Sequence, residues 1–206
     1  MKTLILSLLI ITLCLNAHAA DWNTSGTVRT SGGELHYRVS GTGKPLLLLH
    51  GYSGYGEQWG DFLDEFVDSY KVIAVDLPGH GQSSKLRSSF IIADAARDMW
   101  QLMDHLGVKQ IHGVGYSAGG MTLLQMALQE PSRVQSMVLA ASAFTVLEDR
   151  SGEPFELLPE AYRQDLLRNH NGDMEKIRSM LSAKSVADIK VSDLWDLKIP
   201  TLLVSG

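Results

Sequence analysis

The sequence has one cysteine in 206 residues, so no disulfide can form within the chain. It lacks C-x-x-C, H-E-x-x-H and EF-hand patterns, and no metal site is expected. The 18 basic residues are outnumbered by 23 acidic ones and form no cluster, which argues against a nucleic-acid-binding protein. Aromatic residues make up 7% of the chain and hydrophobic residues 45%, a composition typical of a globular protein.

Long hydrophobic stretches are also scarce, and the one at the N-terminus indicates targeting. Lys2 precedes an apolar run from Leu4 to Leu15, and Ala17-His18-Ala19 then forms an A-x-A cleavage signal. The run is shorter than the roughly 20 residues that span a bilayer, so no stable membrane span is expected. A buried N-terminal helix is the alternative. The pattern favours a signal peptide over residues 1–19 and export to the periplasm or beyond. Cleavage removes the only cysteine, which suits an oxidising compartment.

Alternating strand and helix patterns then predict an α/β fold. Apolar runs bounded by turn signals predict buried strands at 46–49, 72–75, 111–115, 137–140 and 201–205. Two further strands, 28–30 and 34–39, flank the turn at 31–33. Helical spacing of apolar residues predicts helices over 58–67, 92–106 and 118–129. Such alternation implies a mostly parallel sheet covered on both faces, which is a three-layer α/β/α sandwich.

The ends of the second helix carry recognisable signals. Ser88 or Ser89 is expected to cap its start, and Gly107 its end.

The alternation stops between residues 143 and 196, where only helix-like patches at 159–169 and 173–182 occur. About 50 residues are few for an independent core, so this stretch is expected to be a helical cap over the sheet. The predicted organisation is one domain over 20–206, with its core at about 26–142 and 197–206 and its cap at about 143–196.

The chemistry is expected at Gly115-Tyr116-Ser117-Ala118-Gly119. This G-x-S-x-G pattern directly follows a predicted strand and directly precedes a predicted helix, as a nucleophile elbow requires. The turn needs small residues two positions either side of the serine, and both are glycine. Ser117 is therefore the candidate nucleophile, and the Ala118 N–H is aimed at a developing oxyanion.

A second signal, His50-Gly51-Tyr52, follows the strand predicted at 46–49. A backbone N–H from this loop would complete the oxyanion hole, and Tyr52 is the candidate donor. His50 is expected to be structural and to bond to the loop backbone, because the base of such a hydrolase comes late in the chain.

A third signal makes the set of motifs specific to one family. It follows the strand predicted at 72–75 and reads Asp76-Leu77-Pro78-Gly79-His80-Gly81-Gln82-Ser83. The sequence resembles the α/β-hydrolase superfamily over about residues 26–206. The resemblance rests on three motifs in this order and spacing: H-G-x, D-L-P-G-H-G-x-S and G-x-S-x-G. The similarity is to single-domain esterases, lactonases and C–C-bond hydrolases with a helical cap. It implies the α/β-hydrolase fold, a small-molecule acyl substrate, no cofactor and no metal.

The same resemblance implies roles for individual residues. Ser117 is the nucleophile, Tyr52 and Ala118 supply the oxyanion N–H groups, and Asp76 and His80 are structural. A serine at the elbow favours acyl transfer to water over displacement of halide, for which related dehalogenases use aspartate. Related cofactor-free haloperoxidases also use serine, so a haloperoxidase side activity is compatible with the same residue.

The expected acid and base are missing from the sequence. The resemblance places the acid in a G-x-x-D pattern beginning at Gly206, and the histidine after the next strand. Glu148 and Asp149 are expected to be solvated cap residues, and chain order argues against His36, His105, His112 and His170 as the base. The chain is therefore expected to be a C-terminally truncated and inactive hydrolase. The alternative is a short binding module that has lost the triad.

Two phosphate-binding patterns are weaker rivals. Residues 113–118 match the dinucleotide pattern G-x-G-x-x-G/A, but several predicted strands precede it and no acidic residue ends the strand that follows. Gly41-Thr42-Gly43-Lys44 lacks the serine or threonine of a P-loop and is expected to be a turn.

Apolar residues of the predicted cap have two interpretations. Either these residues line an acyl pocket, or they pack the cap onto the sheet. The residues concerned are Phe144, Phe155, Leu157, Leu158 and Trp195.

Overall fold

A computed structural model describes residues 21–86, 89–142, 154–183, 185–186 and 189–205. The expected signal peptide lies outside these residues, as do Ser88, Phe144, Glu148 and Asp149. Within the described ranges, no helix is both long and apolar enough to cross a membrane.

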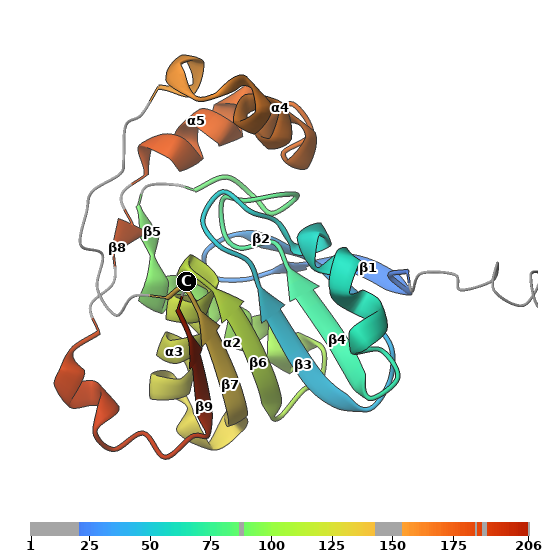
Figure 1. Cartoon of the computed structure of the whole chain (residues 1–206), viewed down its shortest axis with the longest axis vertical. Coiled ribbons are helices and arrows are strands. Elements are labelled where there is room, and N and C mark those ends of the chain that lie inside the picture. The colour runs from blue at the N-terminus through green and yellow to red at the C-terminus, as the bar shows by residue number, and fades with distance from the viewer. Residues whose placement is uncertain (1–20, 87–88, 143–153, 184, 187–188, 206) are drawn as a thin grey trace, which may run out of the picture.

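A seven-stranded sheet forms the centre of the protein (Figure 1), in the order β1-β2-β4-β3-β6-β7-β9. Its strands are β1 (Thr24–Arg29), β2 (Glu34–Ser40), β3 (Lys44–Leu49), β4 (Tyr70–Val75), β6 (Ile111–Tyr116), β7 (Val134–Ala140) and β9 (Thr201–Val204). β1 and β2 form an antiparallel hairpin, β2 pairs antiparallel with β4, and the remaining pairs are parallel. The mostly parallel sheet is thus confirmed.

Alternating side chains of the central strands pack on opposite faces of the sheet. Leu47 and Leu49 of β3 belong to the main core with α2 (Ile92–His105) and α3 (Ala118–Gln129). Leu46 and Leu48 face the other side, where Leu63 of η1 covers them. Continuous apolar runs in these strands therefore reflect burial on both faces, and the α/β sandwich is confirmed.

Two local expectations need correction. The segment expected as an α-helix over 58–67 is a 3-10 helix, η1 (Gly56–Glu65), whose buried residues are Gly56 and Leu63. Ser89 does not cap α2, because Ile91 occupies the cap position without a side-chain hydrogen bond. The C-terminal signal is confirmed, since Gly107 has φ +67° and its N–H donates to the Asp104 carbonyl.

The helices α4 (Glu160–Asn169) and α5 (Met174–Ser182) lie beyond the carboxyl ends of the parallel strands (Figure 1). They pack around a small cluster of buried residues, namely Leu158, Leu166, Ile177 and Met180. The short strands β5 (Phe90–Ile91) and β8 (Ser185–Val186) pair in parallel. The described residues also form the 3-10 turns η2 (Pro131–Arg133), η3 (Phe155–Leu157) and η4 (Val191–Leu194). The boundaries of the cap stay a prediction.

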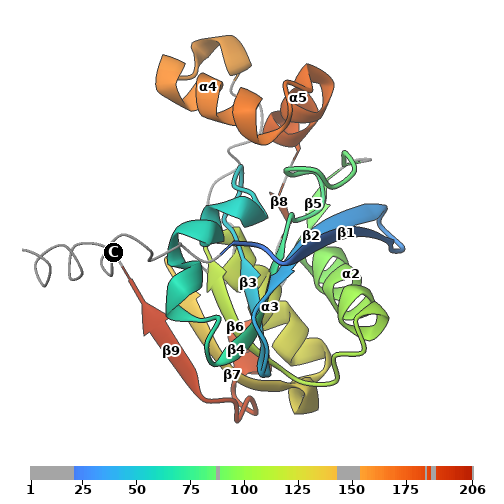
Figure 2. The same ribbon diagram turned by 90° about the vertical axis from the view of Figure 1, so that its right-hand side faces the viewer.

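The strand β9 pairs with β7 on one side and forms an edge of the described sheet (Figure 2). Leu202, Leu203 and Val204 are 59%, 63% and 47% exposed. An exposed apolar edge strand is a template for pairing with other chains.

We therefore expect Leu203→Lys to reduce aggregation of the 206-residue chain, because lysine on an edge strand opposes edge-to-edge pairing. The side chain is already exposed, so the free energy of unfolding should change by no more than about 0.5 kcal/mol. Light scattering during refolding measures the effect. Leu47→Lys, in the buried strand β3, is the control that should unfold the protein. Unchanged aggregation of Leu203→Lys would contradict the interpretation of this edge.

Candidate functional site

The strand β6 ends at Tyr116 and the helix α3 begins at Ala118, which leaves Ser117 as the whole connection. Ser117 has φ +50° and ψ −116°, a conformation that side-chain-bearing residues rarely adopt. Its N–H donates to the carbonyl of Ala140 in the neighbouring strand at 2.8 Å. The strained turn that the sequence predicts is present, and it places the serine at the carboxyl edge of the sheet.

The two glycines of the motif are required by close packing of backbone. A Cβ at Gly115 would lie 2.5 Å from the Gly120 Cα, and one at Gly119 would lie 2.3 Å from the Leu49 carbonyl oxygen. Both distances are far below ordinary contact, so any side chain would force α3 away from β6 or β3. The spacing of G-x-S-x-G thus follows from how near the helix approaches the two strands.

The loop after β3 packs directly on the elbow. A Cβ built on Gly51 would lie 3.3 Å from the Ser117 Cβ and 2.8 Å from the Tyr116 Cδ1. Tyr52, the next residue, is therefore close to the serine. Ala118 is the first residue of α3, so its N–H has no acceptor within the helix and lies at the positive end of the helix dipole. The assignment of these two N–H groups to an oxyanion hole stays a prediction.

His50 is held by backbone groups on both ring nitrogens. The Leu77 N–H donates to Nε2 at 3.0 Å, so Nδ1 carries the proton and donates to the Gly51 carbonyl at 2.6 Å. Burial lowers the pKa of His50 to about 4. The structural role expected for His50 is confirmed: it joins the loop after β3 to the loop after β4.

Asp76 organises the loop after β4. Its carboxylate is buried and accepts hydrogen bonds from the N–H groups of Gly56 and Gln82, at 2.6 and 2.9 Å. His36 Nδ1 lies 3.1 Å from the same group and Arg38 lies 3.4 Å away. Burial alone would raise the pKa of Asp76, but the hydrogen bonds outweigh it and hold that pKa well below its usual range. Fully engaged in this way, Asp76 is structural, as the resemblance implies.

His80 is as buried as Asp76, but only one of its two ring nitrogens makes a hydrogen bond to a described residue. Its Nδ1 donates to the Pro78 carbonyl at 2.9 Å, and its Nε2 has no hydrogen-bond partner among the described residues. The ring packs between His50 and Phe90, and burial lowers its pKa to about 3. His170, from the end of α4, contacts this ring with centroids 6.3 Å apart and is likewise unpartnered at Nε2.

No described residue makes a hydrogen bond to the Ser117 hydroxyl. His36 is engaged with Asp76, and His112 Nδ1 lies 2.8 Å from the Ser136 hydroxyl. His105 packs edge-on against the Tyr37 ring. Glu148 and Asp149 lie outside the described residues. The described part of the chain therefore places no base at the hydroxyl of Ser117, the predicted nucleophile.

The side chain of Tyr52 has a role that the sequence gives no sign of. Its hydroxyl donates to the Met180 carbonyl at the end of α5 and lies 3.3 Å from the Ala183 carbonyl. Burial raises the pKa of Tyr52 to about 12, so the hydroxyl remains a donor. One residue thus carries a candidate oxyanion N–H and a bond to the helices above it.

The two interpretations of the apolar cap residues are only partly correct. Leu158 and Phe155 pack within the α4–α5 cluster. Leu157 and Trp195 are 72% and 76% exposed, so neither is packed onto the sheet. An apolar residue in a short connecting turn carries no periodicity from which its direction could be predicted.

The rival dinucleotide pattern does not have the required geometry. Gly113 lies inside β6 and is paired with Met137 of β7, instead of lying in the turn that would face a pyrophosphate.

Comparison with known proteins agrees with this geometry. The sequence pattern of the α/β-hydrolase fold family matches residues 44–202. The magnesium-chelatase 30 kDa subunit of Rhodobacter capsulatus is 35% identical over 145 residues, 68% of this chain and 50% of that protein. A putative carbamate hydrolase of Variovorax paradoxus is 40% identical over 109 residues, 51% of this chain and 41% of that protein.

Solved structures show the same fold at lower identity. A hydrolase from Pseudomonas aeruginosa superimposes with a TM-score of 0.71 at 24% identity, covering 90% of this chain and 81% of that one. A carboxylesterase from Bacillus subtilis gives 0.72 at 19% identity, with coverage of 98% and 80%. The chain spans half or less of the length of the curated relatives it matches.

The buried histidines predict loss of stability in mild acid. The unfolded chain binds protons at His50 and His80 below about pH 6.5, whereas their folded pKa values are about 4 and about 3. The stability that the neutral rings contribute is complete above about pH 6.5 and is lost as the pH falls towards 4. The loss is about 1.4 kcal/mol per pH unit for each ring.

Urea unfolding should therefore show a free energy of unfolding at least about 2 kcal/mol lower at about pH 5.5 than at about pH 7. His80→Gln, which removes one of the two groups, should reduce that difference by about half. Equal stability at the two pH values, or an unchanged difference in the variant, would contradict the burial of neutral rings.

Proposed function

Because the chain belongs to the α/β-hydrolase family, we propose that it is a serine hydrolase acting on an ester-type or related acyl bond of a small molecule. The observation that carries the proposal is the strained conformation of Ser117 between β6 and α3, with the Gly51–Tyr52 loop against it. Strained backbone at a serine of this kind is typical of a nucleophile elbow.

In the proposed reaction the Ser117 oxygen attacks the acyl carbonyl carbon while its proton passes to a general base. The oxyanion that forms accepts hydrogen bonds from the N–H groups of Tyr52 and Ala118. The C–O bond to the leaving group then breaks, and the leaving alkoxide takes the proton from the base. Water hydrolyses the acyl-enzyme through the same oxyanion and restores the serine hydroxyl.

The names of the structural neighbours support an acyl substrate. Among chains with TM-scores of 0.65 to 0.70 are an N-acyl homoserine lactonase, a naproxen esterase and a meta-cleavage product hydrolase. One relative is named a putative carbamate hydrolase, and a carbamate also contains a carbonyl carbon. These likenesses support the reaction class and leave the choice of substrate open.

We further propose that the acid and the histidine belong to a segment that follows Gly206 in the intact enzyme. The described histidines make other contacts, and the order of the triad in this fold is serine, acid, histidine. The 206-residue chain on its own is then expected to be inactive or nearly so.

The catalytic proposal is tested with p-nitrophenyl acetate. The 206-residue chain should give at most a residual rate, roughly 10³-fold over water, because only the oxyanion N–H groups can act. Extension with a segment that carries an aspartate in the G-x-x-D position and a later histidine should restore turnover. Ser117→Ala in the extended protein should abolish it, and Ser142→Ala, next to the elbow, is the matched control that should retain it.

Two outcomes would contradict the proposal at different points. A fast rate from the unextended chain that depends on Ser117 would show that the base lies within residues 1–206. A full rate from the extended Ser117→Ala protein would show that Ser117 is not the nucleophile.

We also propose that the protein is exported, on the basis of the apolar run and the Ala17-His18-Ala19 site. Expressed with its own N-terminus in a Gram-negative host, the protein should reach the periplasm or medium and begin at Ala20. N-terminal sequencing measures this. Arginine at Ala17 and Ala19 should block processing, because signal cleavage needs small residues at these positions, and exported protein that retains Lys2 would contradict the assignment.

A further inference from the structure

The helices α4 and α5 are both bonded to the loop that follows β3. The Tyr52 hydroxyl of this loop donates to the Met180 carbonyl near the end of α5. The Tyr162 hydroxyl of α4 donates to the hydroxyl oxygen of Ser53, the next residue of the loop. The Tyr52 side chain also packs against both the main core and the α4–α5 cluster. Each helix is thus attached to one of two consecutive residues beside the nucleophile elbow.

Ser53 has a backbone conformation that needs support. The residues from Gly51 to Gly54 form a turn, in which the Gly54 N–H donates to the Gly51 carbonyl at 3.0 Å. Ser53 is the third residue of this turn and has φ +63°, where glycine is the usual choice. A serine keeps such a conformation only where the surrounding structure holds it.

The hydroxyl of Ser53 is held on both sides. It donates to the Tyr52 carbonyl at 2.6 Å and accepts from the Tyr162 hydroxyl. Successive hydrogen bonds of this kind polarise and strengthen one another. Tyr162 therefore supports the left-handed backbone of Ser53 from the neighbouring helix.

The same turn fixes the peptide group between Gly51 and Tyr52. Its carbonyl accepts hydrogen bonds from the Gly54 N–H and from His50 Nδ1, at 3.0 and 2.6 Å. The N–H of this planar peptide belongs to Tyr52 and points away from the carbonyl. The direction of the Tyr52 N–H therefore depends on the Gly54 N–H, and hence on the backbone of Ser53.

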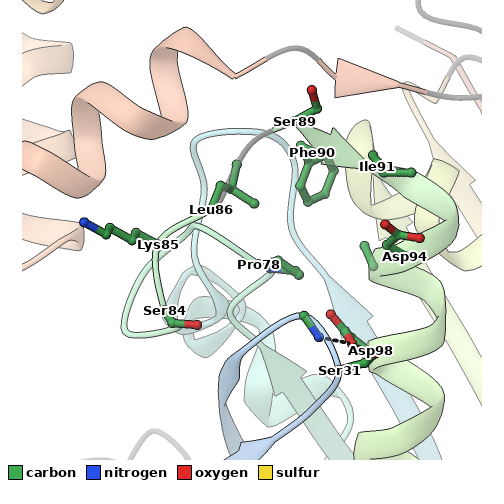
Figure 3. A pocket seen from close by; sticks show the side chains of 12 residues that line it. Ser31, Pro78, Ser84, Lys85, Leu86, Ser89, Phe90, Ile91, Asp94 and Asp98 are labelled. Carbon is green, nitrogen blue, oxygen red and sulfur yellow. Dashed lines mark hydrogen bonds between the residues drawn. The ribbon is translucent and has the colours of Figure 1, made fainter.

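The core confines the ring of Tyr52 at the same time. The ring packs edge-on against His80 and Phe90, with centroids 5.1 and 5.9 Å apart. Phe90 projects from β5 towards the loop that contains Pro78 (Figure 3). The core thus fixes the ring of Tyr52, whereas α4 and α5 hold the hydroxyl groups of the loop.

We propose that Tyr162 is a positioning residue for the oxyanion hole: its hydroxyl holds Ser53, and through the turn it aims the Tyr52 N–H at the oxyanion. This inference rests on the proposed function, in which the Tyr52 N–H is an oxyanion donor. A donor that is fixed before the reaction stabilises the developing charge most effectively. Contact of α4 with the loop then completes the oxyanion hole, and separation of α4 weakens it without moving Ser117.

Amide hydrogen exchange tests the structural part of this proposal in the 206-residue chain, where no catalysis is needed. Tyr162→Phe should accelerate exchange of the Gly54 N–H about fivefold or more, as expected for the loss of one hydrogen bond that keeps the turn closed. Arg163→Gln removes an ion pair of the same helix and is the matched control, which should leave this exchange unchanged within about twofold. Exchange in α3 reports global stability and should stay the same in both variants.

The catalytic part is tested with p-nitrophenyl acetate in the protein extended beyond Gly206, with rates normalised to folded protein. Tyr162→Phe should lower kcat and kcat/KM by the same factor, roughly tenfold, and leave KM unchanged. The factor is smaller than the roughly 10²–10³ lost with a whole oxyanion donor, because the N–H remains but is less well aimed. Arg163→Gln should retain the full rate.

A double-variant comparison separates positioning through Ser53 from a general weakening of the helices. Ser53→Gly removes the hydroxyl but adopts the positive φ without strain, so the turn keeps its shape. In the Ser53→Gly background, Tyr162→Phe should therefore have no further effect on Gly54 exchange or on kcat.

Four results would overturn the inference. They are Gly54 exchange within about twofold of the unaltered chain in Tyr162→Phe, equal acceleration in Arg163→Gln, a full effect of Tyr162→Phe in the Ser53→Gly background, and an unchanged kcat of Tyr162→Phe. If that kcat is unchanged while turnover depends on Ser117, the proposed function stands and only the positioning role fails. If the extended protein shows no turnover that depends on Ser117, the proposed function itself fails.

Discussion

The left-handed backbone of Ser117 is the constraint on which the rest of the site depends. Such a conformation costs on the order of 1–3 kcal/mol and persists only where surrounding structure over-determines it. Here the N–H of Ser117 donates to the Ala140 carbonyl, and α3 approaches β3 so closely that a Cβ at Gly119 would lie 2.3 Å from the Leu49 carbonyl oxygen. Because β3 and β7 flank β6 in the sheet, the strain is held by three neighbouring strands and one helix. The half-buried position of Ser117 at the sheet edge is thus a property of the whole central sheet.

A second constraint, the buried carboxylate of Asp76, fixes the loops around the elbow. It receives hydrogen bonds from the start of η1 and from the loop after β4, and it is paired with Arg38 and His36 of β2. Removing one member of such a network leaves a buried charge uncompensated and typically costs about 3–5 kcal/mol. The polar residues of the D-L-P-G-H-G segment therefore hold in place the loop that supports Tyr52, and their closeness to the site does not make them reactive.

The elements that sequence reasoning placed correctly are those fixed by local rules. Buried strands such as β3 and the elbow at Ser117 follow from apolar runs, turn residues and one spacing motif. What it missed depends on contacts between distant segments. The 3-10 geometry of η1 leaves only Gly56 and Leu63 buried, and the Tyr52 hydroxyl reaches Met180 across 128 positions of sequence. Helical periodicity cannot distinguish a 3-10 from an α-helix in so short a segment.

The attachment of α4 and α5 differs in kind from the packing of the elbow. Lys176 donates to the Gly81 and Ser83 carbonyls, Tyr52 bonds to the end of α5, and Tyr162 donates to the Ser53 hydroxyl. Each such bond can be exchanged for water at a net cost of about 1 kcal/mol, whereas the elbow is held by close-packed backbone that has no alternative arrangement. Relative motion of these helices and the sheet is therefore less costly in free energy than motion within the elbow. The backbone at Ser117 thus stays fixed, whereas the position of the helices above it can change.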